Sequence, residues 1–409
     1  MNSARTAAPP RGVRRLLVAA NPDLNAHLTA YGPLPAGQAA TLIDAVAAAG
    51  LRGRGGAAFP AARKLAAVAA GSRPIVIANG AEGEPESSKD AVLLTRAPHL
   101  VLDGLAAAAD AAGARECHLY APEPALVSVR RALAERRAAG YDRHRVELTT
   151  AAGHFLDGEK TAVINRIAGR AALPSDQLVS TSRAGLRGRP TLVHNVETLA
   201  HIALIARYGA RWFREFGTAD EPGTMLVTLS GAGVFEVPLG MPLPDLIAYA
   251  GYTDPRAVRA VLIGGYHGAW IPAGALRSTT LSAAALRPLH ASPGAGIIRV
   301  LPTTECGLRA AAEITSYLAD QSAGQCGPCR FGLPALATTL ADLAAGRPTD
   351  VHEIARLAGL VDGRGACHHP DGTARFVRST LAVFADDVRA HQHGTCRIAY
   401  AATRTLAPR

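Results

Sequence analysis

The chain has 409 residues, of which 48% are hydrophobic and 19% charged, so it can bury a large core and divide into two or more domains. Its formal net charge is +10, but the basic residues are scattered and only 5% of the residues are aromatic, which argues against nucleic-acid binding. No stretch of about 18 apolar residues occurs, and six cysteines in so long a chain do not make a disulfide framework. We therefore expect a globular cytoplasmic protein without a transmembrane segment.

The first half of the chain alternates apolar runs, typical of buried strands, with helical stretches. Residues 1–40 read as a tail and a short lead-in. The expected strands are 74–78, 117–120 and 146–150, and the expected helices are 42–49, 61–70, 92–112, 124–139 and one that begins near 157–165. This alternation predicts an α/β fold with a doubly wound parallel sheet, in which ligands bind beyond the carboxyl ends of the strands.

The second half changes character twice. Residues 192–199 read as the entry to a further helix, with helix capping as the ordinary role of His194 and Asn195. Short strands are then expected at 225–229, 234–237 and 261–263 around one helix at 243–250, which suggests a small β-grasp domain. From residue 303 the chain reads as a helical bundle, with helices near 306–321, 333–344, 351–360 and 373–391. The predicted parts are the tail and lead-in, the α/β domain, the β-grasp domain and the bundle: 1–40, 41–221, 222–298 and 299–398.

The most informative stretch is residues 50–64, which combines four glycines with cationic side chains. Glycine leaves the backbone open to a ligand and allows positive φ, so successive N–H groups can point into one concavity. Arg52, Arg54 and Lys64 surround this concavity, and a helix follows at once, as in a phosphate-binding loop. The spacing matches neither of the common nucleotide-binding glycine motifs, and an Arg- and Gly-rich surface loop is the alternative.

The chain contains only three lysines: Lys64, Lys89 and Lys160. Arginine has replaced lysine almost everywhere else. A lysine that persists in such a chain suggests a position where a compact ammonium group matters.

The cysteines suggest a metal centre in the helical part of the chain. Cys326 and Cys329 form a Cys-x-x-Cys loop between two expected helices, and Cys367 follows later. This pattern suits a thiolate-bound metal or an iron–sulfur cluster, with a redox-active Cys-x-x-Cys pair or unliganded cysteines as alternatives. The remaining cysteines are expected in the core or are left unassigned: Cys117, Cys306 and Cys396.

Taken together, several separated stretches resemble the NADH-oxidising, FMN-binding subunit of respiratory complex I and its relatives in NAD-linked hydrogenases and formate dehydrogenases. The matching stretches occur in the family's order over about residues 30–395, namely 50–60, 79–85, 158–162, 194–199, the Cys-x-x-Cys-Arg region and Cys367. The resemblance implies a flavin domain, an SLBB-like β-grasp domain and a bundle that holds a 4Fe–4S cluster. It also implies an oxidoreductase in which FMN takes a hydride from NADH and passes single electrons to the cluster.

The resemblance also assigns individual residues. The implied cofactor-binding residues are Gly53, Arg54, Gly55, Gly56, Lys64, Asn79, Glu82, Glu84, Glu159, His194 and Asn195, and the implied metal ligands are Cys326, Cys329 and Cys367. The glycines and Lys64 correspond to contacts with the FMN phosphate and ribityl chain. Glu84 corresponds to a contact with the nucleotide ribose, and Phe59 to an aromatic side chain near the nucleotide. No side chain is implied as catalytic.

The chain departs from the family pattern at several of these places. Ala81 replaces a flavin-contacting Asp, His194 an Asn, Ala323 the first cluster Cys and Lys160 a Glu, while Ala67 and Ser180 replace aromatic residues. We therefore expect NADH to bind weakly, since two lost aromatic stacks cost on the order of tenfold to a hundredfold in affinity. We also expect an incomplete or unusually ligated cluster. It would be a 3Fe–4S cluster, or its fourth ligand would come from a partner or from Asp320, Ser322, His368 or Cys306.

The expected partners are other redox subunits or a ferredoxin-like protein, a role that also allows a peripheral place on a membrane complex. Two alternatives stay open at this point. One is a scaffold subunit that kept the fold and lost part of the redox path. The other is a stand-alone NADH dehydrogenase that reduces a small acceptor.

Overall fold

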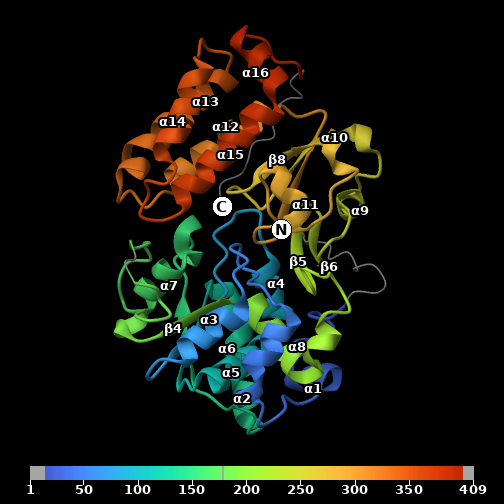
Figure 1. Ribbon diagram of the computed structural model, residues 1–409, viewed down its shortest axis with the longest axis vertical. Helices are drawn as coiled ribbons and strands as arrows, with labels where there is room; N and C mark the ends of the chain where they lie inside the picture. The colour runs from blue at the N-terminus through green and yellow to red at the C-terminus, as the bar shows by residue number, and fades with distance from the viewer. Residues whose placement is uncertain (1–13, 177–178, 399–409) are drawn as a thin grey trace. The chain divides into compact units, whose positions relative to one another are not determined.

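The computed structural model describes residues 14–176 and 179–398, so residues 1–13 of the predicted tail lie outside the described part of the chain. The chain divides into two compact units. The first contains the residues up to Thr253 together with 263–265 and 276–299, and the second contains 254–262, 266–275 and the residues from Val300 onward. Figure 1 shows the elements of both units in chain order. The division into four parts made from the sequence stays a prediction.

The first unit is built on a parallel four-stranded sheet in the order β3-β2-β1-β4. The strands are β1 (Ile75–Asn79), β2 (Glu116–Ala121), β3 (Val146–Thr150) and β4 (Thr191–Asn195). The predicted parallel sheet is therefore confirmed, and three of its strands were expected. The fourth, β4, was not, because we read residues 192–199 as the direct entry to a helix.

Helices cover both faces of this sheet. The larger core cluster is formed with α2 (Ala39–Ala49), α3 (Ala61–Ala69), α4 (Lys89–Arg96), α5 (Pro98–Ala112), α6 (Glu123–Ala138) and α8 (Val196–Phe213), and a smaller one with α7 (Lys160–Ile167). Successive side chains of a strand point to opposite faces, so Val76 and Ala78 join the larger cluster, and Ile75 and Ile77 the smaller. Burial on both faces explains why the strands read as continuous apolar runs.

The single helix expected over 92–112 is wrong, because α4 and α5 are separate and meet at an angle of 95°. The break falls at Ala97, directly before Pro98, whose ring cannot continue the preceding helix. No single helix in the described residues is long and apolar enough to cross a membrane, although this bent pair meets the criterion by length and composition. Most of α5 is buried in the core of the first unit.

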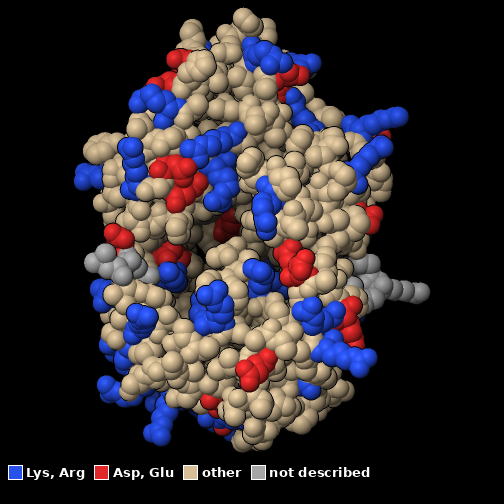
Figure 2. Space-filling view, viewed as in Figure 1, with Lys and Arg blue, Asp and Glu red and all other residues tan. Residues whose placement is uncertain are grey.

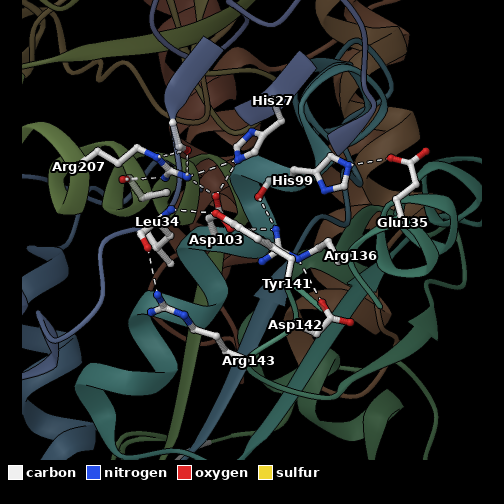
Figure 3. A network of polar contacts seen from close by, with 12 residues as sticks. His27, Leu34, His99, Asp103, Glu135, Arg136, Tyr141, Asp142, Arg143 and Arg207 are labelled. Carbon is white, nitrogen blue, oxygen red and sulfur yellow. Dashed lines mark hydrogen bonds and ion pairs between the residues drawn. The ribbon is translucent and has the colours of Figure 1, made fainter. Parts of the chain in front are cut away.

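A buried carboxylate on α5 holds several of these helices together (Figure 3). Asp103 lies 2.8 Å from the Nε2 of His27 in α1 (Leu24–Tyr31) and 2.9 Å from the Nη1 of Arg136 in α6, and it also pairs with Arg207 of α8. Helix α1 lies within the predicted lead-in, where no helix was expected. The network fixes the helices that support the parallel sheet.

A second, mixed sheet has the strand order β6-β5-β9-β7-β8. Its strands are β5 (Thr224–Leu229), β6 (Gly233–Pro238), β7 (Val258–Ile263), β8 (Ala269–Pro272) and β9 (Ile297–Pro302), and α9 (Leu243–Ala248) lies between β6 and β7 in the chain. Strand β5 runs antiparallel to β6 and parallel to β9. The strands β5, β6 and β7 were predicted, while β8 and β9 were missed.

The C-terminal part of the second unit is helical, as predicted. Its helices are α12 (Gly307–Asp320), α13 (Leu333–Ala344), α14 (Val351–Val361), α15 (His369–Val383) and α16 (Ala385–Gln392). The single helix expected over 373–391 is wrong, because the backbone leaves helical geometry at Phe384. Phe384 packs against Gly307, where a Cβ would lie 2.4 Å from its ring, and stacks edge-on to Trp270.

Figure 2 shows the charged side chains of one face. Lys and Arg side chains are spread over this face among acidic and uncharged residues, and they do not gather into one continuous patch. The net positive charge of the chain therefore does not concentrate on the visible face.

Candidate functional site

The first unit has a ligand-binding edge where strand order reverses. The chain passes from β1 to β2 and β3 on one side, and β4 then lies on the other side of β1. Asn79 ends β1, Asn195 ends β4, and the two residues are paired in register. The Nδ2 of Asn195 donates to the carbonyl oxygen of Asn79 at 3.3 Å. In doubly wound sheets, ligands bind in the crevice at this switch point.

The glycine loop lies directly against this edge. Gly50 ends α2 in the left-handed conformation (φ 70°), and the N–H of Gly53 donates to the carbonyl of Phe59 at 2.9 Å, which closes the loop. A Cβ at Gly55 would lie 3.2 Å from the Cβ of Asn195. Gly56 has φ of 108°, which L-residues rarely adopt. The backbone therefore forms a cradle beside β4 that larger residues would fill.

Lys64 places a cation at the same edge. It lies in the first turns of α3, and its Nζ donates to the carbonyl oxygen of Val193 at 3.1 Å. It forms no ion pair with any residue that the structure describes. Burial and the nearby Lys160 lower the pKa of Lys64. An ammonium group without a carboxylate partner among these residues, next to a glycine cradle, fits an anionic phosphate.

Arg54, also predicted as a cofactor-binding residue, is buried. Its N–H donates to the Oγ1 of Thr198 at 2.9 Å, and its Nε donates to the carbonyl oxygen of Thr224 at 3.2 Å. The guanidinium thus fixes the glycine loop to α8 and β5.

A buried charge network stands behind the two asparagines. The Nζ of Lys89 lies 2.7 Å from Asp90, 2.9 Å from Glu197 and 3.3 Å from the Oδ1 of Asn195. The Nδ2 of Asn195 donates to Asp90 at 2.5 Å. Asn195 also caps α8 by accepting from the N–H of Glu197 at 3.1 Å, so the capping role expected for it is confirmed. These contacts fix the orientation of the Asn195 amide.

The same network shifts the pKa values of its carboxyl groups. Burial raises the pKa of Asp90 to about 7, although Lys89 acts against this. Burial also acts to raise the pKa of Glu197, but Lys89 outweighs it and lowers that pKa to about 2. Lys89 is a functional residue that our site prediction omitted. Its rarity in this arginine-rich sequence was the available signal.

The three predicted glutamates serve different local structures. Glu82 accepts from the Oγ of Ser87 at 2.5 Å and from the N–H of Ala91 at 3.0 Å, which closes the loop before α4. Glu84 lies against Gly265, where a Cβ would be only 2.0 Å from its carboxylate oxygen. Glu159 caps α7 by accepting from the N–H of Thr161 at 2.7 Å.

Asn79 connects the α7 end to the sheet edge, since its Nδ2 donates to the carbonyl oxygen of Gly158 at 2.9 Å. His194 is buried, and its Nε2 has no hydrogen-bond partner among the described residues. Burial and Lys64 lower the pKa of His194 to about 3, so its imidazole is neutral. The structure therefore brings Gly55, Lys64 and His194 to one edge with both asparagines.

The residues that differ from the family pattern lie at accessible positions. Lys160, Ala67 and Ser180 are exposed, and Phe59 has 47% of its surface exposed with the Arg63 guanidinium 5.7 Å from its ring centre. Lys160 and Lys64 are close enough to repel each other. This edge is therefore more cationic than a site with Glu at position 160 would be.

The second unit brings three cysteines together. Burial raises the pKa of Cys329 to about 12, and the neighbouring Cys326 and Cys367 act in the same direction. The N–H groups of Cys329 and Ala366 donate to Cys326 and lower its pKa against the effect of burial. The Cys-x-x-Cys loop and the segment before α15 thus meet. Three thiols fit three corners of an iron–sulfur cluster.

The fourth corner has no cysteine at the family's position, because Ala323 carries no donor atom. Of the alternatives, His368 has a fully exposed side chain that pairs with Asp371 at 3.0 Å. Cys306 lies instead with His391 and Cys396. Neither observation supplies a fourth ligand.

Comparisons with known proteins agree with this geometry. Residues 46–204 match the Nuo51 FMN-binding domain, and residues 309–391 match the NADH-ubiquinone oxidoreductase-F iron-sulfur binding region. The chain is 32% identical to the second F-type component of the NADH-quinone oxidoreductase of Rhizobium meliloti, over 86% of this chain and 88% of that protein. It is 31% identical to the NADP-reducing hydrogenase subunit HndC of Solidesulfovibrio fructosivorans over 86% of this chain and 76% of that one.

A solved structure shows the same fold. The NAD+-reducing NiFe-hydrogenase in its air-oxidised state contains a chain that is 31% identical, with a TM-score of 0.79 over 86% of this chain. Our chain spans 62% of the length of that hydrogenase chain. With both regions matched, the chain belongs to the family of the FMN-binding subunit of NADH-quinone oxidoreductase, whose members are oxidoreductases with an FMN-binding domain and an iron–sulfur-binding region.

Proposed function

We propose that this chain is a flavin-linked electron-transfer subunit that exchanges electrons between FMN and an iron–sulfur cluster. The observation that carries the proposal is the cradle at the ends of β1 and β4, where the backbone of Gly55 lies against Asn195 beside the ammonium group of Lys64. When bound, FMN supplies the conversion between two-electron hydride chemistry and one-electron transfer. The four-part domain division is proposed with it, since each cofactor then has a domain of its own.

In this proposal each predicted residue has a defined task. Backbone N–H groups of Gly53, Gly55 and Gly56 bind the phosphate end of the cofactor, and Lys64 neutralises its charge. The amides of Asn79 and Asn195 orient the flavin ring, and the buried network around Lys89 keeps Asn195 in place.

The remaining assignments concern the rim of the site and the cluster. Glu82, Glu84 and Glu159 shape the loops at the rim, and Arg54 fixes the glycine loop. Cys326, Cys329 and Cys367 hold the cluster, which is either a 3Fe–4S cluster or a 4Fe–4S cluster with a ligand other than cysteine.

The natural electron donor is less defined than the cofactor. Lys160, Ala67 and Ser180 make the nucleotide side more cationic and remove aromatic faces, so we propose that NADH binds weakly. The relatives named above are components of an NADH-quinone oxidoreductase and of a hydrogenase. By analogy, we propose that the partners of this chain are other redox subunits or a ferredoxin-like protein.

The test is to purify the full chain and measure the flavin released on denaturation. We expect noncovalent FMN, and we expect the charge reversal Lys64→Glu to weaken its binding at least tenfold. The matched control is Arg96→Glu, the same charge reversal at an exposed position at the end of α4, which should leave the affinity unchanged. If the folded wild-type chain takes up no FMN on reconstitution, the proposal is wrong.

A second function class is favoured by the substitutions Ala81 and Ala323, which remove one flavin contact and one cluster ligand of the family pattern. It is a scaffold subunit that kept the fold without the redox path. The absorbance spectrum of the purified protein separates the two, because a scaffold would be colourless after anaerobic reconstitution with FMN, iron and sulfide.

A further inference from the structure

Three side chains of metal-binding type meet in the second unit, apart from the cysteines assigned above. Cys306, His391 and Cys396 each offer one donor atom, and the three atoms lie within 4.8 Å of one another. The Sγ of Cys306 lies 3.4 Å from the Nε2 of His391. Cys306 and His391 are buried, and Cys396 is partly exposed.

These separations match a tetrahedral metal centre. With Zn–S bonds of about 2.3 Å and Zn–N bonds of about 2.0–2.1 Å, neighbouring ligand atoms of a tetrahedral zinc site are about 3.4–3.8 Å apart. The 3.4 Å between Cys306 and His391 is at the lower end of this range, and small side-chain rotations bring Cys396 within it. Two thiolates and one imidazole prefer zinc to the hard cations magnesium and calcium.

The position of Cys306 favours its thiolate form. It is the N-cap of α12, and the N–H groups of Leu308 and Arg309 point toward its sulfur. The amino end of a helix stabilises negative charge. The neighbouring thiol of Cys306 is Cys396, whereas the neighbouring thiols of Cys329 are Cys326 and Cys367. The chain therefore carries two separate sets of thiols in its C-terminal part.

We propose that Cys306, His391 and Cys396 bind one Zn²⁺ ion, with water as the fourth ligand. Binding replaces the two thiol protons with the metal, releases them to solvent and changes no oxidation state. The ion joins the start of α12 to the end of α16 and to the segment beyond it, across a sequence separation of 85 residues between Cys306 and His391. All three predicted cluster ligands lie between these points in the chain. The zinc ion therefore closes the helical bundle around the cluster loop.

The test measures zinc and iron by mass spectrometry in the full chain, purified without oxygen and with any affinity tag removed. We expect about one zinc per chain in the wild type. Cys306→Ser and Cys396→Ser should lose at least four-fifths of it. The matched control is the double variant Cys326→Ser/Cys329→Ser, which should lose iron and keep its zinc. In this variant the zinc X-ray absorption spectrum should show two sulfur ligands, one nitrogen and one oxygen.

Two results keep the proposal falsifiable even where Cys306→Ser fails to fold. Wild-type protein loaded with Co²⁺ should show the sulfur-to-metal charge-transfer bands and strong visible bands of a tetrahedral thiolate site. His391→Gln should shift these bands while keeping the charge transfer. Zinc that disappears only with Cys326 and Cys329, cobalt bands without sulfur ligation, or a Cys306–Cys396 disulfide in the anaerobic protein would each overturn the assignment.

Discussion

The charge network around Asp103 supports a quantitative prediction for the stability of the first unit (Figure 3). Asp103 has no exposed surface and interacts with His27, Arg136 and Arg207. In Asp103→Asn the side chain keeps its shape but loses the charge that compensates two buried guanidinium groups. Breaking a buried ion pair from one side costs about 3–5 kcal/mol.

The remaining contacts decide where in this range the loss falls. Arg136 keeps Asp142 at 3.2 Å, whereas Arg207 keeps only backbone carbonyls, those of Gly32 and Ala203, among the residues described. We therefore expect a loss near the lower end, about 3 kcal/mol. This corresponds to roughly a hundredfold change in the folding equilibrium.

The assay is urea denaturation followed by tryptophan fluorescence. The chain has two tryptophans, Trp212 in α8 and Trp270 in β8, so a Trp270→Phe background reports on the first unit alone. The matched control is Asp110→Asn on the same helix, because Asp110 pairs with Arg143 and His144 at a partly exposed site. Such pairs contribute about 0–1 kcal/mol. Equal losses in the two variants would refute the reasoning.

The pH dependence gives a second check. Burial acts to raise the pKa of Asp103, but His27, Arg136 and Arg207 outweigh it and lower the pKa from its ordinary value of 3.8. A lowered carboxyl pKa contributes stability that is complete above the ordinary value and is lost as the pH falls below it. The difference between wild type and Asp103→Asn should therefore be constant above about pH 5 and shrink below about pH 4. A difference that grows on acidification would contradict the assignment.

Three further predictions concern the candidate sites. Lys160→Glu should speed the reduction of bound flavin by NADH in stopped-flow absorbance and lower any preference for NADPH, and an unchanged rate would assign the weak reaction to the lost aromatic faces. Lys89→Met leaves two buried carboxylates without their cation, so it should cost about 3–5 kcal/mol in urea denaturation, and a loss below about 1 kcal/mol would show that the network does not hold the site. Ala323→Cys should convert the cluster to a 4Fe–4S form with a changed EPR spectrum and more iron per chain, and an unaltered iron content would place residue 323 away from the open corner.

The predictable part of the fold depended on local signals. Continuous apolar runs identified β1, β2 and β3, and proline and glycine marked many helix ends. The strand β4 was missed because it is five residues long and runs directly into α8, with no turn residue between Thr191 and the cap Asn195. The break at Phe384 was missed because no glycine or proline lies there, and only tertiary packing on Gly307 and Trp270 accounts for it.

The candidate site shows the same division between local and long-range information. The glycine loop and Lys64 could be recognised from composition and spacing alone. The pairing of Asn79 with Asn195 required β4, since a residue read as the start of a helix has no place in a sheet register. The charge network beneath them joins Lys89 to Glu197 across 108 positions, a separation that no local pattern encodes.

The cysteines carry the argument one step further. Sequence spacing identified Cys326 and Cys329 as a pair, because a Cys-x-x-Cys motif is a local feature. It gave no reason to connect Cys306 with Cys396, which the fold brings together through α12 and α16. Once Cys306 is placed with His391, it is no longer a natural candidate for the open corner of the cluster. The loss of a ligand at Ala323 therefore has no replacement from that cysteine, which leaves a three-cysteine cluster or a ligand from outside the family pattern.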